Sequence, residues 1–171
     1  MTTQPQSHHG VLVSINSKGI LITGKAGIGK SSLALELLYQ GHQLIADDVV
    51  ELHMLDQQII GQCPPLLEGL LHTRELGLID IATVFNRNAW HHSHAVDYVV
   101  HLQQANLDIT LRPTPAIFTF AGISLPSVTL NPHNPASLSH RIHCWLAMQE
   151  NAKNTADTFT LRHTELMTET L

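Results

Sequence analysis

The chain has 171 residues, of which 43% are hydrophobic and 13% charged, a composition typical of one globular domain rather than of a disordered protein. Its net charge of −5 and its scattered lysines and arginines exclude the concentrated positive surface that nucleic-acid binding requires. No apolar run approaches the roughly 20 residues of a membrane span, so we expect no membrane partner. The amino terminus lacks an export signal and Cys63 and Cys144 lie far apart, which favours a reduced, cytoplasmic location.

The first half of the chain predicts several short elements in order. Residues 1–8 are polar, and we expect them to be flexible. Two β-branched runs, 10–15 and 19–24, predict a hairpin. After a glycine-rich turn, leucines at helical spacing over 31–40 predict a helix, and Gly41 is suited to end it.

The middle of the chain predicts a mixture of strands and one helix. The apolar run 43–52 predicts a strand that two adjacent acids interrupt. Leucines at helical spacing after a proline predict a helix over 64–74. Residues 76–85 and 95–102 predict further strands.

The last part predicts a hairpin and a closing helix. Residues 116–130 indicate two strands joined by a tight turn, and 137–151 indicate an amphipathic helix with its histidines on the wetter side. Residues 152–171 are polar and weakly patterned, and we expect a tail. Without an internal repeat or a linker, residues 9–151 are expected to form one α/β domain.

The glycine-rich turn, "GKAGIGKS", fits the pattern G-x-x-x-x-G-K-[ST] between a predicted strand and a predicted helix. Glycines leave backbone N–H groups free to surround phosphates, and the helix start adds the positive end of its dipole. Lys30 is expected to reach the β- and γ-phosphates, and the Ser31 hydroxyl to bind Mg²⁺. The pattern therefore predicts a nucleoside triphosphate or a similar polyphosphate. The expected binding residues are Gly24, Lys25, Ala26, Gly27, Ile28, Gly29, Lys30, Ser31 and Ser32.

Two adjacent acids, Asp47 and Asp48, lie midway through an apolar run. Successive strand residues face opposite sides, so both acids can serve one ligand only if the strand ends there. Phosphoryl transfer needs a group that binds the metal and a base for the hydroxyl nucleophile, and this pair can supply both. A solvated strand end or a turn is the alternative interpretation.

Taken together, these residues resemble the catalytic domain of HPr kinase/phosphorylase, and they are most similar to the short proteobacterial forms. The resemblance covers roughly residues 9–150. It rests on His9-Gly10, Gly24 to Ser31, Gly41-His42 with Ala46-Asp47-Asp48, Arg74-Glu75-Leu76-Gly77, and "FAGISLP" at 120–126.

The resemblance implies an ATP-dependent kinase that acts on a serine of the phosphocarrier protein HPr by Mg²⁺-assisted transfer of the γ-phosphoryl group. It also implies a P-loop α/β domain with a central mixed β-sheet flanked by helices. Family members assemble as hexamers, so a homo-oligomer is expected. ATP and Mg²⁺ are the expected cofactors.

Carried onto this sequence, the resemblance gives roles to the polar residues already noted. Lys30 holds phosphates, and the aspartate pair supplies the catalytic base and a metal contact. We favour Asp48 as the base and Asp47 as the metal group, with His9 near the active site. Arg74 is expected to contact a phosphate or to form a surface salt bridge.

The chain departs from the family at a metal-binding position. Where the family has "LEIRGLG" or "LEVRGLG", with a glutamate that helps to hold metal, this chain has "LHTRELG" and therefore His72. A carboxylate suits Mg²⁺ better than an imidazole does. Either the second metal contact is weaker, or Glu75 or Asp80 replaces it.

A second departure concerns the reverse reaction. The long forms carry a basic "PGRN" loop tied to phosphorolysis, whereas residues 131–137 here have no basic residue apart from His133. A kinase without phosphorolysis is therefore one interpretation. An ATP-binding sensor without transfer, and a kinase of another protein or of a small hydroxyl compound, are the alternatives.

Histidine is frequent, with 13 in the chain. His91 and His94 have the i,i+3 spacing of a zinc site, but only if the segment is helical. No cysteine or acid lies near them in the sequence, so an exposed loop is the favoured interpretation.

Overall fold

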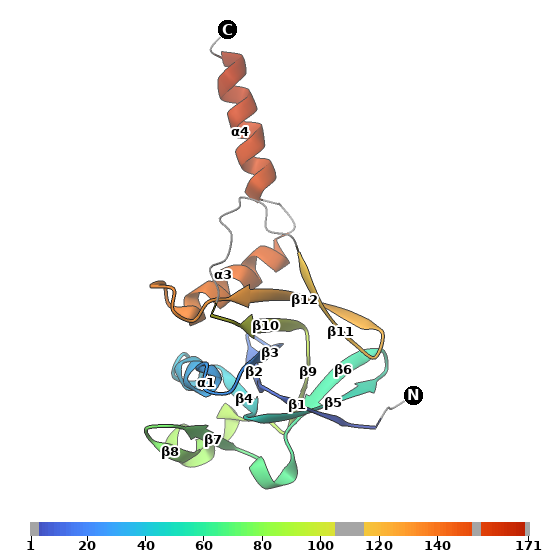
Figure 1. Ribbon diagram of the computed structural model, residues 1–171, viewed down its shortest axis with the longest axis vertical. Coiled ribbons are helices and arrows are strands. Elements are labelled where there is room, and N and C mark those ends of the chain that lie inside the picture. Colours follow the sequence, from blue (N-terminus) through green and yellow to red (C-terminus); the bar gives the residue numbers. More distant parts are fainter. Residues whose placement is uncertain (1–3, 105–114, 152–154, 170–171) are drawn as a thin grey trace.

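The computed structural model describes residues 4–104, 115–151 and 155–169. Its largest element is a six-stranded mixed sheet, ordered β11-β12-β10-β3-β2-β4, in which β10 runs parallel to both β3 and β12 (Figure 1). This confirms the expected mixed sheet. The strands are β2 (Val11–Ile15), β3 (Lys18–Gly24), β4 (Gln43–Ala46), β10 (Tyr98–Leu102), β11 (Ala116–Phe120) and β12 (Ile123–Leu130).

The remaining strands form two smaller antiparallel sheets. The four-stranded sheet has the order β1-β5-β6-β9, and β7 and β8 form a hairpin of their own. Their bounds are β1 (Gln6–His9), β5 (Val49–Leu55), β6 (Gln58–Gln62), β9 (Ser93–Ala95), β7 (Leu70–Thr73) and β8 (Gly77–Asp80).

The predicted helices at both ends of the domain are confirmed, and they pack together on one face of the large sheet (Figure 1). The first of them, α1, ends as predicted, because Gly41 adopts φ +87° and the backbone N–H groups of Gly41 and His42 bond back to Leu38 and Leu37. The helices are α1 (Lys30–Tyr39), α2 (Ile81–Val84), α3 (Leu138–Glu150) and α4 (Thr155–Glu169), with short 3₁₀ turns η1 (Pro65–Leu67) and η2 (Arg87–Ala89).

The core has two halves on either side of the large sheet. On β2, Val11 and Val13 face the helices, where they join a cluster with Leu37, while Leu12 between them packs against Leu52 of the four-stranded sheet. All five residues of β2 are buried because both faces of this strand are covered. The domain is therefore a three-layer sandwich of helices, mixed sheet and antiparallel sheet.

The predicted helix over 64–74 is wrong. Instead, η1 is followed by β7, and Gly69 between them has φ +67°. A Cβ on Gly69 would lie 3.1 Å from the ring of Trp90, so the indole packs against this bend. Leu66 is 87% exposed whereas Leu71 is fully buried, so the leucine spacing does not mark one helical face.

Three further expectations need correction. Residues 76–85 form a strand only as far as Asp80, whose side chain accepts a hydrogen bond from the Thr83 N–H and caps α2. Residues 6–8, where we expected no strand, belong to β1, which pairs with β5. Within the expected tail, 155–169 form α4, which stands apart from the sheets in Figure 1. Residues 1–3, 152–154 and 170–171 of these segments lie outside the described residues.

The two cysteines are free, as expected. Cys63 is fully buried, and burial raises the pKa of its thiol to about 11, so it packs as a small apolar group. Within the described ranges, no helix has the length and apolar character needed to cross a membrane.

Close packing at Gly19 gives a first prediction. A Cβ on Gly19 would lie 1.8 Å from the Ala95 carbonyl oxygen, so Gly19→Ala should lower the free energy of unfolding by about 3 kcal/mol. Gly41→Ala is the control, because open space surrounds this position and only its positive φ opposes a side chain. We expect this control to lower the free energy of unfolding by about 1 kcal/mol. Urea unfolding of both variants would contradict the close approach if the two losses were equal.

Candidate active site

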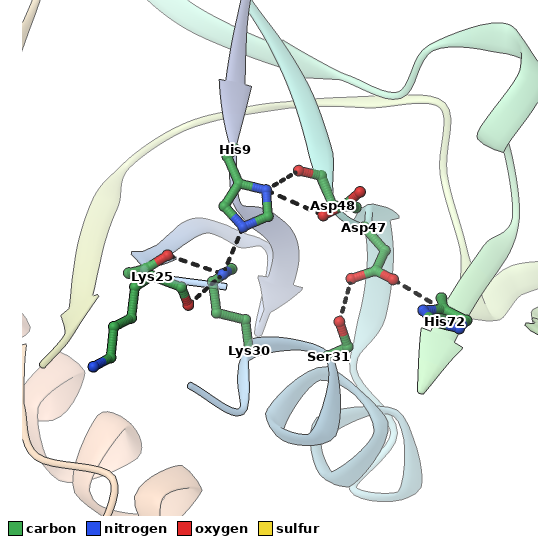
Figure 2. A network of polar contacts seen from close by, with 8 residues as sticks. His9, Lys25, Lys30, Ser31, Asp47, Asp48 and His72 are labelled. Carbon is green, nitrogen blue, oxygen red and sulfur yellow. Dashed lines mark hydrogen bonds and ion pairs between the residues drawn. The ribbon is translucent and has the colours of Figure 1, made fainter. Parts of the chain in front are cut away.

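The site lies where two neighbouring strands pass from one sheet to the other. The chain crosses at His9-Gly10, between β1 and β2, and again at Asp47-Asp48, between β4 and β5. The Gly10 N–H donates to the Asp48 carbonyl oxygen (3.1 Å), which joins the two crossings. Asp48 has φ +68°, so the strand ends there and both aspartates can turn toward the glycine-rich loop (Figure 2).

The Lys30 ammonium is buried beneath that loop, with 6% of the residue exposed. It donates to the carbonyl oxygens of Gly24 (2.9 Å) and Lys25 (3.1 Å) and to Nε2 of His9 (3.0 Å). These contacts use all three of its donor positions. Burial lowers the pKa of Lys30, and the negative charges of Asp48 and Asp47 partly offset that effect.

His9 connects Lys30 to Asp48 (Figure 2). Because an ammonium can only donate, Nε2 of His9 is the acceptor and its proton resides on Nδ1. Nδ1 accordingly donates to the Asp48 carbonyl oxygen (3.0 Å) and lies 3.1 Å from Oδ1 of the same residue. The Asp48 side chain is 68% exposed, so its carboxylate is oriented by His9 and open to an incoming group.

Asp47 takes a different environment from its neighbour. It is buried, and its two oxygens accept from the Ser31 hydroxyl (2.7 Å) and from the His72 backbone N–H (2.8 Å). Burial raises the pKa of Asp47, and these two hydrogen bonds partly offset the effect. The Ser31 and Asp47 oxygens are hard donors within contact of each other, a set that fits Mg²⁺.

A cavity of about 410 Å³ opens beside these groups. Its walls include Asp48, and the β7–β8 turn lies opposite the loop. A Cβ on Gly27 would lie 2.2 Å from Nη2 of Arg74, so a glycine here lets the guanidinium rest on the loop. Oγ1 of Thr73 is buried without a hydrogen-bond partner among the described residues, which leaves a polar atom available to a ligand.

The structure brings most of the predicted binding residues together. Gly24 and Lys25 contribute carbonyl oxygens to Lys30, and Ile28 belongs to the hydrophobic core rather than to the cavity wall. The loop residues that line the cavity are Ala26, Gly27, Gly29, Lys30, Ser31 and Ser32.

The residues at the first departure from the family pattern, the metal-binding position, are also placed. His72 and Glu75 line the cavity, whereas Asp80 caps α2. Sequence reasoning missed the contact from the His72 backbone to Asp47, since a backbone N–H leaves no signal in residue types.

The histidine-rich segment contributes no active-site group. His94 lies in β9, and its Nε2 is 3.3 Å from the Ser14 hydroxyl, while His92 pairs with Glu68 (2.7 Å). Across the described ranges, no three histidine, cysteine or acidic side chains group as metal ligands.

Comparison with known proteins identifies the family to which the chain belongs. A sequence model described as HPr Serine kinase C-terminal domain matches residues 1–163. The HPr kinase/phosphorylase of Nitrosomonas europaea is 46% identical over 99 residues, which are 57% of this chain and 31% of that protein. The HPr kinase/phosphorylase of Limosilactobacillus reuteri is 40% identical over 129 residues, which are 73% of this chain and 40% of that protein.

One solved structure is similar over nearly the whole domain. It is the Hpr(Ser) kinase/phosphatase from Coxiella burnetii, with a TM-score of 0.79 and 31% sequence identity, over 92% of this chain and 98% of that one. The curated relatives are longer, since the chain spans about a third of the N. europaea protein and two fifths of the L. reuteri protein.

The environment of Asp47 predicts a pH dependence. Because folding raises the pKa of Asp47, protonation of this carboxyl favours the folded state. The resulting stabilisation is fully present below the unfolded pKa of about 3.9, and it is lost as the pH rises through the folded pKa. Asp47→Asn removes the charge and keeps an acceptor for the His72 N–H. We expect the ligand-free variant to be more stable than the wild type at neutral pH and equal to it in acid.

Urea unfolding from acid to neutral pH measures the difference in free energy of unfolding between Asp47→Asn and the wild type. Asp48→Asn is the matched control, because its carboxylate is exposed and its replacement removes no buried charge. A pH-independent difference for Asp47→Asn would contradict the burial argument.

Proposed function

The chain belongs to the family of HPr serine kinase C-terminal domains, and from that membership we propose that it is an ATP-dependent kinase that phosphorylates a serine of HPr. The observation that carries the proposal is the continuous contact Lys30–His9–Asp48, which joins a phosphate-binding loop to an exposed carboxylate. The names of the curated relatives and of the C. burnetii protein support the choice of HPr as the acceptor.

The loop would hold the phosphates of ATP. Its glycines expose backbone N–H groups at the start of α1, and the Lys30 ammonium lies at the same end of that helix. Lys30 would exchange carbonyl partners for phosphate oxygens. Arg74, which rests on Gly27, would add a second positive charge beside them. Ser31 and Asp47 would hold Mg²⁺, which when bound neutralises charge on the phosphates.

Asp48 would act as the base. Its carboxylate is exposed to a protein substrate and would take the proton of the serine hydroxyl as that oxygen attacks the γ-phosphorus, the bond to the β–γ bridging oxygen breaks and ADP leaves. His9 would orient the carboxylate through Nδ1. Because His9 is itself held by Lys30, the base and the phosphate site would keep a fixed relation to each other.

The proposal is confined to the kinase direction. No basic side chain is contributed by residues 131–137 apart from His133, so this segment lacks the charge expected for phosphorolysis. By analogy with the family, we also propose a homo-oligomer that works in the cytoplasm. An ATP-binding sensor stays the rival candidate, because His72 replaces the metal-binding glutamate of the family pattern.

The decisive experiment incubates the chain with labelled ATP, Mg²⁺ and the host's HPr, and detects phosphoserine by mass spectrometry. Lys30→Ala should abolish transfer, whereas Lys18→Ala, at the far end of β3, should not. Asp48→Asn should lose about 10²-fold or more in rate and still bind ATP. Transfer by Lys30→Ala at the wild-type rate would overturn the loop assignment. Bound ATP without transfer by the wild type would favour the sensor or another acceptor.

The departure at His72 gives a separate prediction. His72→Glu should place a carboxylate on the cavity wall and lower the Mg²⁺ concentration needed for half-maximal ATP binding by about tenfold. His72→Gln is the control, since it has the same length as glutamate without the charge. The Mg²⁺ dependence of binding of a fluorescent ATP analogue measures both, and an identical requirement in the two variants would show that position 72 does not approach the metal.

A further inference from the structure

A second group of polar side chains lies at the opposite end of α1 from Lys30. His42, just before β4, and His143, on α3, direct their Nε2 atoms toward each other at 3.2 Å. Oε1 of Gln40, at the end of α1, lies 3.2 Å from the same Nε2 of His143. Three potential metal ligands therefore converge from α1, the start of β4, and α3.

The protein alone leaves this group short of protons. A glutamine carbonyl oxygen only accepts, so both contacts are hydrogen bonds only when the Nε2–H of His143 is shared between Gln40 and a bare Nε2 of His42. Each of the three atoms has a lone pair to offer a cation once that proton is removed. We infer that Gln40, His42 and His143 form a binding site for a divalent transition-metal ion of the Zn²⁺ type, with water completing the coordination.

The spacing suits such an ion. Tetrahedral Zn²⁺ with bonds of about 2.0–2.1 Å places neighbouring ligand atoms about 3.3 Å apart. Both measured separations are 3.2 Å. Imidazole nitrogens are preferred ligands of Zn²⁺, Ni²⁺ and Cu²⁺ rather than of Mg²⁺, so the site would be distinct in chemistry from the one at Asp47.

A chain of hydrogen bonds fixes the glutamine with its oxygen toward the histidines. Nε2 of Gln40 donates to the Ser139 hydroxyl (2.9 Å), and this fully buried hydroxyl donates to Glu36 (2.6 Å). The carboxylate thus orients Ser139, which orients Gln40, as outer groups do around metal ligands.

The backbone also holds His42 in place beside the helix. The turn at Gly41, closed by the hydrogen bond from the His42 N–H to the Leu37 carbonyl oxygen (3.0 Å), fixes His42 relative to α1.

Metal here would stiffen the elements that carry the active site. Lys30 begins α1 and Asp47 follows β4, and an ion bound at their far ends would tie both elements to α3. The inference does not depend on the proposed kinase activity.

The test is calorimetric titration of the full chain with Zn²⁺, in excess Mg²⁺ to occupy carboxylate sites. We expect one site whose affinity falls at least about tenfold in His42→Gln and in His143→Gln. His140→Gln is the matched control, because it removes an exposed histidine one turn earlier on α3 and should bind as the wild type does. Equal affinity in all four proteins, or loss only in His140→Gln, would overturn the site.

A second measurement covers variants that fail to fold. In the wild type, the imidazole ¹⁵N resonances of His42 and His143 should shift together at one equivalent of Zn²⁺. Shifts confined to other histidines would overturn the assignment without any substitution.

Discussion

The buried ammonium of Lys30 is the constraint on which the site depends. A charge removed from water must be matched by acceptors, and Lys30 finds them in Gly24, Lys25 and His9. Two of these contacts close the loop around its own lysine, and the third holds β1 against the loop. The same contact sets the tautomer of His9 and through it the position of the Asp48 carboxylate.

The three-layer sandwich explains why these groups meet at one place. Where the chain passes from one sheet to the other, the hydrogen bonds between neighbouring strands are interrupted. The two interruptions lie side by side, at His9-Gly10 and at Asp47-Asp48. The freed backbone groups bond across the gap, as in the contact from the Gly10 N–H to Asp48. Polar side chains at such a break can face a ligand without interrupting either hydrophobic core.

Helix α1 connects distant parts of this structure. Its first residues follow directly from the glycine-rich loop, its buried leucines pack on β2, and its last turn meets α3 through Gln40, Ser139 and the two histidines. One continuous helix therefore contacts both the glycine-rich loop and α3. The arrangement also shows how a family scaffold accommodates His72, since its backbone N–H, not its side chain, supports Asp47.

The sequence by itself determined the parts that rest on local chemistry. The glycine-rich loop, the hairpin of β2 and β3, the end of α1 at Gly41, and α3 each follow from contacts within a few residues. The family resemblance could be recognised from the loop together with short motifs such as Ala46-Asp47-Asp48. Only the tertiary structure decided the rest. Residues 64–74 bend at Gly69, where Trp90 packs, and do not form the helix that their leucine spacing predicts. The polar residues of β1 form a strand because they pair with β5. His42 and His143 are 101 positions apart, so only packing of α1 against α3 could bring their nitrogens together.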